Sequence, residues 1–467
     1  MKKLYCGLLF TLLGLMLAVG VVSLLDEDPT VSRLENRKLK EPPEFSWAAL
    51  WDGSYFQGLD EYYADTFPLR DQLLGLNRKL NQFYYYSGSD NVVAIQGSGG
   101  AEYGGENLDE VQRVLAGQDQ PGQLADPAPE TPPEQKPADP PEDPEDEQPP
   151  ADPNLDVPDE GAAVKTDSTI IIVGDNAMDI PTATYSIIED YAAAVTGLAQ
   201  AMGEGVQTYS LVTPNSGEFY SPESFHTGSN SQKDMIDYCY AAMGENVRTV
   251  DAYSALRRHV DEYIYFRTDH HWTARGAYWA YTAFCETAGL EAVDLDRFER
   301  SQLDGFLGTM YQWTSGIPQS ETLKANPDYV EVFRPIVGIG DVNYYMDSTL
   351  STPYGSAVIA HVDESVGNKY LTFIGGDTPI FIAEIEQEGP VVMVVKESYG
   401  NAFVPFLTSH YSKIIVVDPR EFNRDGKPSL NLPEFAASQG VNDLIVINYP
   451  FMINSSSYIS RLNGLWQ

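Results

Sequence analysis

The chain has 467 residues, enough for one large domain with appendages or for two domains. Its formal net charge of -39 at pH 7 excludes nucleic-acid binding by neutralisation of phosphates and predicts repulsion from anionic lipid surfaces. Hydrophobic residues make up 43% of the sequence, which suits a folded protein.

The N-terminus predicts a transmembrane anchor over residues 1–25. The apolar run from Leu4 to Leu25 is long enough to cross a bilayer as a helix. Lys2 and Lys3, which precede it, favour a cytoplasmic start. A cleaved signal peptide is the alternative, but its apolar core is usually shorter and no clear small-x-small cleavage site is present. Either interpretation places the rest of the chain outside the cytoplasm. With an uncleaved anchor, the protein is a single-pass cell-membrane protein with an extracytoplasmic main domain.

Two regions of different character follow the predicted anchor. Residues 26–103 are expected to form a juxtamembrane region that packs on the main domain, with a helical pattern over 55–85 and a short strand at 91–95. Residues 104–165 form an insert rich in Pro, Asp and Glu. This insert cannot bury enough apolar surface to offset the entropy of ordering, so we expect it to be disordered and without a catalytic role.

Residues 166–467 predict an α/β domain in which short apolar runs alternate with helical segments. The expected strands lie at 170–173, 207–212, 247–250, 391–395, 413–417 and 444–448. Strands of this kind joined by helices favour a parallel sheet with helices on both faces. The stretch 296–388 mixes Gly, Pro, polar and β-branched residues, which indicates a β-rich insertion with antiparallel strands and active-site loops.

The three cysteines leave the redox state of the chain open. Cys6 lies in the predicted anchor, whereas Cys239 and Cys285 lie on predicted helices and can form either two buried thiols or a disulfide. Because the sequence contains no CxxC, thiol redox chemistry and zinc-ribbon sites are not expected.

One candidate site is an Asp-x-His group between an apolar run and a helix. In an extended segment Asp269 and His271 point the same way and His270 points away. The carboxylate can hold the histidine in one tautomer and stabilise its protonated form, and Thr273 is a suitable N-cap for the following helix. The alternatives are a buried polar cluster at a helix start and a metal site. Since the other histidines are scattered, no metal or cofactor is predicted.

A second candidate site is Ser398, between the expected strand at 391–395 and the start of another helix. Such a turn exposes a hydroxyl at the C-terminal edge of a parallel sheet, where ligands of open α/β folds bind. The N–H groups of Tyr399 and Gly400 could then stabilise an oxyanion. The alternative is an ordinary turn or cap serine.

The sequence resembles the DHHW proteins, a bacterial envelope family. The segment that gives this family its name is Thr268-Asp269-His270-His271-Trp272, and further similar segments lie at residues 34–39, 61–71, 306–311, 375–377 and 397–406. The DHHW proteins are in turn similar to the SGNH-hydrolase-like domains of alginate O-acetylation proteins. The resemblance implies an SGNH-hydrolase-like (flavodoxin-like) fold and a triad of Asp269, His271 and Ser398 that moves acetyl groups onto a polysaccharide. It also implies, as a partner, a multi-spanning membrane O-acyltransferase that brings acetyl groups across the membrane.

The chain departs from this pattern at two positions. Glu397 stands where the family usually has Asp before the serine, and Asp377 stands where related sequences commonly have Asn. An amide can donate a hydrogen bond to an oxyanion, whereas a carboxylate cannot unless it is protonated, so Asp377 is not a predicted donor. Asn215 and Asn176, at predicted strand ends, are alternative donors or ordinary turn residues.

We therefore expect an extracytoplasmic serine O-acetyltransferase or esterase that acts on a cell-envelope polysaccharide. Transfer and hydrolysis share their chemistry and differ in whether water is excluded. The alternatives are a non-catalytic envelope module that binds glycan or protein in the same cleft, and a metal-dependent hydrolase.

Overall fold

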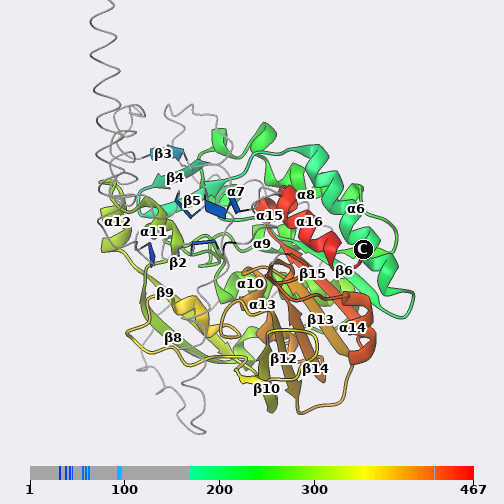
Figure 1. Ribbon diagram of the computed structural model, residues 1–467. Helices are drawn as coiled ribbons and strands as arrows, with labels where there is room; N and C mark the ends of the chain where they lie inside the picture. The colour runs from blue at the N-terminus through cyan, green and yellow to red at the C-terminus, as the bar shows by residue number, and fades with distance from the viewer. Residues whose placement is uncertain are drawn as a thin grey trace, which may run out of the picture. The chain divides into compact units, whose positions relative to one another are not determined.

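Figure 1 shows the computed structural model, which describes residues 169–424 and 426–467 and short pieces at 31–32, 37–38, 42–43, 45, 55–56, 58–59, 62–63 and 92–96. The chain divides into two compact units, one comprising Met1–Tyr86 with Gln312–Pro318 and the other Ser87–Tyr311 with Gln319–Gln467. The predicted anchor at 1–25 and the predicted disordered insert at 104–165 lie outside the described residues. Within the described residues, no helix has the length and apolar character needed to cross a membrane.

The first unit contributes little described structure. Strands β1 (Val31–Ser32) and β2 (Arg37–Lys38) form an antiparallel pair. Residues 55–56, 58–59 and 62–63 are helical and fall within the helix predicted over 55–85, most of which lies outside the described residues.

The second unit is built on an eight-stranded sheet in the order β11-β10-β12-β14-β13-β15-β6-β7 (Figure 1). Five of its strands run parallel: β6 (Gln207–Val212), β7 (Val247–Thr249), β13 (Val391–Lys396), β14 (Lys413–Val417) and β15 (Asp443–Asn448). Three antiparallel strands extend the β14 edge: β10 (Ile339–Tyr345), β11 (Tyr354–Gly355) and β12 (Ile380–Ile385). The predicted α/β class is therefore confirmed, as a mixed fold with a large central sheet.

Helices connect these strands. The two longest are α6 (Tyr185–Met202) and α10 (Ala274–Ala288). The shorter ones are α7 (Gly217–Tyr220), α8 (Gln232–Ala241), α9 (Ala252–Arg257), α11 (Thr309–Thr314), α12 (Ser320–Ala325), α13 (Gly400–Leu407), α14 (Leu432–Gln439), α15 (Pro450–Ile453) and α16 (Ser456–Gly464). Single 3-10 turns lie at η2 (Glu223–Phe225), η3 (Gly228–Asn230), η4 (Leu295–Arg297), η5 (Lys369–Thr372) and η6 (Pro419–Glu421).

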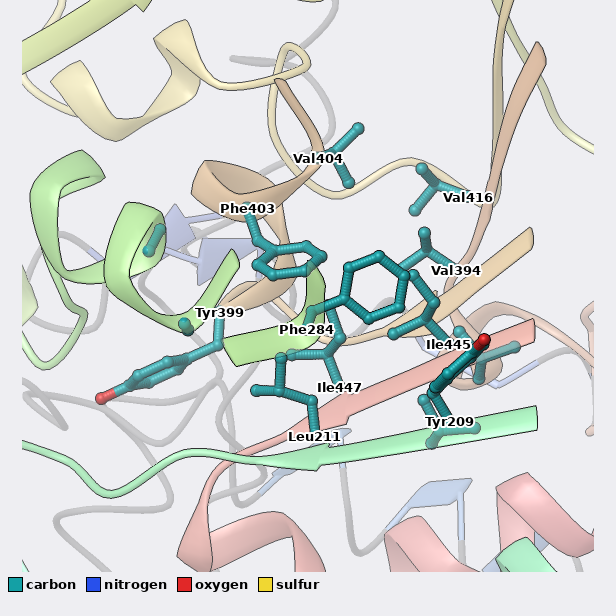
Figure 2. Packing of buried hydrophobic residues seen from close by; sticks show 14 of the residues in the cluster. Tyr209, Leu211, Phe284, Val394, Tyr399, Phe403, Val404, Val416, Ile445 and Ile447 are labelled. Carbon is teal, nitrogen blue, oxygen red and sulfur yellow. The ribbon is translucent and has the colours of Figure 1, made fainter. Parts of the chain in front are cut away.

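The helices cover both faces of the central sheet. On one face Phe284 of α10 meets Tyr209 of β6, with ring centroids 5.1 Å apart, and Figure 2 shows Ile447 of β15 in the same packed cluster. Successive strand residues point to opposite faces, so Asn448 lies on the other face, where it accepts a 2.8 Å hydrogen bond from Tyr191 of α6. Helices α8, α14 and α16 pack against α6. The predicted covering of both sheet faces is thus observed.

The strand predicted at 170–173 does not belong to the parallel sheet, which corrects the expectation. It is β4 (Thr169–Val173), and it pairs antiparallel with β3 (Val92–Gln96) and β5 (Asn176–Ile180). Only Gly174 and Asp175 separate β4 from β5, and Gly174 has φ +62°, so the chain reverses in a tight hairpin instead of leading into a helix.

Two further findings concern the apolar run before the Asp-x-His group and the strands of the stretch 296–388. The apolar run that precedes the Asp-x-His group, residues 263–266, forms no named strand and makes an isolated bridge between Tyr265 and Trp272. Within the stretch 296–388, β8 (Glu299–Phe306) and β9 (Asp328–Arg334) form a separate antiparallel pair, whereas β10 to β12 join the central sheet. Cys239 and Cys285, whose pairing the sequence left open, are buried free thiols.

Candidate active site

Ser398 lies in the turn that leaves β13 at the carboxyl edge of the sheet and enters α13. The turn is closed by hydrogen bonds from Gly400 N to Glu397 O (2.9 Å) and from Asn401 N to Ser398 O (3.1 Å). A Cβ at position 400 would lie 2.6 Å from the Cβ of Lys396, so glycine is needed for this turn to pack against its own strand. The serine side chain is therefore set on a short, fixed connection, as the sequence predicts.

Asp269 and His271 come from the loop that precedes α10. Its two ends are joined by hydrogen bonds from Phe266 N to His271 O (3.3 Å) and from Thr273 N to Ile264 O (2.9 Å). Thr273 caps α10 by accepting a hydrogen bond from Gly276 N, so its predicted role as the N-cap is confirmed.

The indole of Trp272 ties this loop to the serine turn. Its Nε1 donates to Tyr399 O over 2.9 Å, and the hydroxyl of Tyr399 donates to His270 O. Figure 2 shows Tyr399 at the margin of the apolar core, with its hydroxyl directed away from the other labelled side chains. Two segments that are 127 residues apart in sequence are thereby held together on the edge of the sheet.

The structure brings Asp269, His271 and Ser398 into one hydrogen-bonded chain. Oδ1 of Asp269 lies 2.6 Å from Nδ1 of His271, and Nε2 of His271 lies 2.7 Å from Oγ of Ser398. With Nδ1–H donating to the carboxylate, Nε2 is free of a proton and accepts from the serine hydroxyl. The three side chains belong to residues that are 2%, 5% and 9% exposed, so these bonds act in surroundings of low polarity.

Asp269 is held as a carboxylate. Burial alone would raise its pKa, but the interaction with His271 and the hydrogen bonds from His271 and Thr309 N lower the pKa below its usual range. Thr309 donates to Oδ2 from its backbone N (2.8 Å) and from Oγ1 (3.0 Å). A Cβ on Gly308 would lie 2.3 Å from Asp269 atoms, so a glycine allows this close approach. Sequence reasoning missed this role of Thr309, although the segment 306–311 had been singled out.

His270 and Tyr370 both lie beside the ring of His271. The prediction that His270 points away is wrong, because residues 267–271 form a bend instead of an extended segment, and the His270 ring centroid is 3.8 Å from that of His271. Burial, and then the charge of His271, lower the pKa of His270 to about 3, so it is neutral, and its Nδ1 lies 2.6 Å from Thr309 Oγ1. Tyr370 stacks on the His271 ring, with centroids 4.2 Å apart and planes at 11°, and its hydroxyl donates to Ser398 O over 3.1 Å. No feature of the sequence distinguishes Tyr370 from the other tyrosines.

Of the four predicted oxyanion donors, three donate hydrogen bonds to other groups of the protein, and the fourth lies in a different sheet. Tyr399 N donates to Glu397 Oε2 (3.0 Å), and Gly400 N donates within the turn. The Nδ2 of Asn215 donates to Asp179 O (3.0 Å) and Oδ1 (2.8 Å). Asn176 begins β5 in the three-stranded sheet, opposite Val173. The oxyanion role of these residues therefore remains a prediction.

Asp377 is part of a buried ion-pair cluster beside the triad, made of Asp377, Lys396, Arg420 and Asp418. Lys396 Nζ lies 2.5 Å from Asp377 Oδ1, Arg420 donates to Asp377 Oδ2, and Arg420 Nε lies 2.9 Å from Asp418 Oδ1. Burial would raise the pKa of Asp377, but the two cations lower it below its usual range. The carboxylate therefore accepts hydrogen bonds from its neighbours, including Asn401 Nδ2 at 3.0 Å, in agreement with the expectation that it is not a donor.

The metal alternative concerns the same residues. Potential ligand atoms of Asp269, His270 and His271 lie within 4.8 Å of one another. The atoms involved are hydrogen-bonded to each other and to Thr309. A metal ion would have to displace these bonds, so the donor set fits a hydrogen-bonded triad better than a cation.

The family follows from comparison of the whole chain. The sequence pattern of the DHHW proteins matches residues 35–114 and 145–417, more than half of the chain. The chain belongs to the DHHW family. The resemblance seen in the sequence is thus confirmed, and the unmatched residues between the two ranges fall in the acidic insert.

Solved structures agree with this assignment. A DHHW family protein from Eubacterium siraeum is 29% identical over 65% of this chain and 98% of its own, with a TM-score of 0.56. PatB1 from Bacillus cereus is 19% identical over 62% of this chain and 99% of its own, with a TM-score of 0.51. The same protein with a sulfonyl adduct gives a TM-score of 0.50 at 18% identity, over 65% of this chain and 99% of its own. No curated protein matches the chain. The likeness to PatB1 shows the fold alone.

Proposed function

We propose that this DHHW protein is an extracytoplasmic serine O-acetyltransferase or esterase with an SGNH-hydrolase-like fold, acting on a cell-envelope polysaccharide. The observation that carries the proposal is the hydrogen-bonded chain from Asp269 through His271 to Ser398. Each partner has the geometry of its role: an ionised carboxylate on Nδ1, an acceptor nitrogen at Nε2 and a hydroxyl at the exit of a parallel strand.

The geometry allows one complete acyl transfer. His271 Nε2 takes the proton of Ser398 as Oγ forms a bond to the acetyl carbonyl carbon, and the electron pair of the C=O bond moves to its oxygen. When the C=O bond re-forms, the bond from the acyl carbon to the leaving group of the donor breaks, and the leaving group departs with the proton from His271. A sugar hydroxyl, or water, then gives its proton to His271 and attacks the acyl carbon, and Ser398 Oγ leaves and recovers the proton. Asp269 stabilises the positive imidazole in each step, and the triad as a unit supplies a factor of about 10⁴ or more in rate.

The cellular setting is part of the same proposal. The apolar run over 4–25 supports a single-pass anchor with a cytoplasmic N-terminus. In that arrangement the triad faces the envelope, and a multi-spanning membrane O-acyltransferase supplies acetyl groups from the cytoplasm. The net charge of -39 favours a neutral or basic glycan over an anionic one as the acceptor.

The test uses the full-length protein with an activated acetyl ester, with and without an oligosaccharide acceptor. Intact mass reports an acetyl adduct, and mass spectrometry of the oligosaccharide reports transfer. Ser398→Ala should lose both adduct and turnover. Ser409→Ala is the matched control, because the Ser409 Oγ is buried without a hydrogen-bond partner among the described residues. A folded wild-type protein with neither adduct nor turnover would favour the non-catalytic binding module.

A further inference from the structure

The residue before the serine is a buried carboxyl group that the triad does not use. Glu397 is 1% exposed, and its Oε2 accepts from Tyr399 N over 3.0 Å and lies 3.4 Å from Ser398 Oγ. Its Oε1 is buried and has no hydrogen-bond partner among the described residues. An ionised carboxylate with one such oxygen is costly, because a buried charge needs hydrogen bonds or a counter-ion.

The nearby cations do not provide that counter-ion. Lys396 is paired with Asp377, and Arg420 is paired with both Asp377 and Asp418, so the two positive and two negative charges of this cluster cancel. A charged Glu397 would be a third anion in the same buried region. A neutral carboxylic acid at this position avoids that cost.

The titratable groups that face Glu397 come from several elements and do not reverse this balance. They are Arg420 and Asp377 of the ion-pair cluster together with His271, Tyr399 and Tyr458. Burial raises the pKa of Glu397 to about 7, against smaller opposing effects of the Tyr399 N–H and of the charges on Arg420 and His271. The acid form is therefore populated at neutral pH.

Oε2 of Glu397 lies where it can form a hydrogen bond with the carbonyl oxygen of an acyl group on Ser398. Because the carbonyl oxygen of an acyl group on Ser398 is only two bonds from Oγ, it can come within hydrogen-bond reach of an atom that is 3.4 Å from Oγ. Tyr399 N fixes Oε2 there, and a hydroxyl oxygen can carry a proton while it accepts this hydrogen bond.

We infer that Glu397, in its protonated form, is the oxyanion donor of this site. Its Oε2–H donates a hydrogen bond to the oxygen that becomes negative as Ser398 Oγ attacks. The proton stays on Glu397 throughout, since the transferred proton moves between Oγ and His271 Nε2. This role rests on the proposed function. It also gives Tyr399 N a positioning role in place of the direct role that the sequence predicts.

The experiment is the pH profile of kcat/KM for the activated acetyl ester, with the Ser398→Ala rate subtracted at each pH. The full-length wild-type protein should lose about tenfold in kcat/KM per pH unit above about pH 7, as the donor deprotonates. Glu397→Gln keeps the shape but cannot ionise, so its kcat/KM should stay within about threefold between pH 7 and pH 9. Its level should be below that of the wild type at pH 6, because an NH₂ group at the position of Oε2 donates but cannot accept the hydrogen bond from Tyr399 N.

The matched control is Glu218→Gln. Burial raises the pKa of Glu218 to about 7 as well, but its carboxylate is bound by Gln232 N, Lys233 N and Tyr253, outside the triad. This variant should keep the alkaline decline. If Glu397→Gln declines like the wild type, the inference is overturned while the proposed function stands. If no Ser398-dependent turnover exists at all, both are overturned.

A second measurement does not depend on activity. In the Glu218→Gln protein, the infrared carbonyl band of a protonated carboxyl should be present at pH 6 and vanish with a midpoint near pH 7. The band should be missing from the Glu218→Gln/Glu397→Gln protein. Absence of the band at pH 6 in Glu218→Gln would overturn the inference, even if Glu397→Gln failed to fold.

Discussion

Replacement of Asp269 by Asn tests how much the carboxylate contributes, because all four of its hydrogen bonds are accepted ones. Oδ1 accepts from His271 N (2.9 Å) and Nδ1 (2.6 Å), and Oδ2 accepts from Thr309 N (2.8 Å) and Oγ1 (3.0 Å). An amide turns one of these atoms into an NH₂ group. In either orientation the NH₂ group faces a backbone N–H, and in one of them it also faces Nδ1 and forces the proton of His271 onto Nε2.

The expected loss in kcat/KM is about 10³- to 10⁴-fold, or about 4 to 5 kcal/mol, as for Asp-to-Asn replacement in other Ser-His-Asp triads. The unpaired N–H should also lower the free energy of unfolding by about 1–3 kcal/mol. The assay is acetyl-ester turnover at a temperature where denaturant titration shows the variant to be folded.

Asp328→Asn is a control for loss of a buried carboxylate near the same loop. Asp328 accepts from Thr268 N (2.7 Å) and Oγ1 (2.6 Å), and neither bond involves His271. It should lose stability with less than about a tenfold loss of kcat/KM. An Asp269→Asn protein that keeps more than a tenth of the wild-type kcat/KM would refute the argument from tautomer and charge.

Three other outcomes follow from the same contacts. Tyr370→Phe keeps the ring stacked on His271 but loses the hydrogen bond to Ser398 O, so kcat/KM should fall about 2- to 10-fold by initial rates; an unchanged value would show that this bond is not needed. Lys396→Met leaves a buried charge on Asp377 with one cation fewer and should lower the free energy of unfolding by about 3–5 kcal/mol in urea titrations; a loss below about 1 kcal/mol would contradict the ion-pair account. Dialysis against a chelator should leave acetyl-ester turnover unchanged, and a loss that zinc restores would support the metal alternative.

Much of the fold could be predicted because apolar runs mark buried parallel strands. The strands at β6, β13, β14 and β15 lie where the sequence predicts them. The run at 170–173 looks the same by composition, yet it pairs in an antiparallel hairpin sheet, since a two-residue turn follows it. Its partner strand at 92–96 lies more than 70 residues earlier, across the acidic insert. The pattern of apolar residues predicts that a strand is buried, but it does not predict which strand pairs with it.

The site residues also fall into those that the sequence predicts and those that it does not. The pairing of Asp269 with His271 was predicted correctly, but the reason given for it is wrong. Residues 267–271 form a bend and not an extended segment, and Asp269 Oδ1 accepts from both N and Nδ1 of His271. Ser398 was reached through its strand-to-helix turn and the family resemblance. Thr309 and Tyr370 were missed, since their contacts with Asp269 and His271 arise only when distant segments are folded together. The sequence predicts the N–H groups of Tyr399 and Gly400 as oxyanion donors. It does not show that both already donate to Glu397, Tyr399 N to Oε2 and Gly400 N to the backbone O.

The most direct test of the central claim is covalent labelling of the nucleophile. A sulfonyl fluoride reacts with an activated serine hydroxyl, so this class of reagent suits the proposed nucleophile Ser398. The full-length protein would be treated with a sulfonyl fluoride, digested and mapped by mass spectrometry. The account predicts one adduct on Ser398, loss of acetyl-ester turnover in proportion to labelling, and slow labelling of Asp269→Asn. Full labelling of another residue while Ser398 stays unmodified and turnover is unchanged would contradict it.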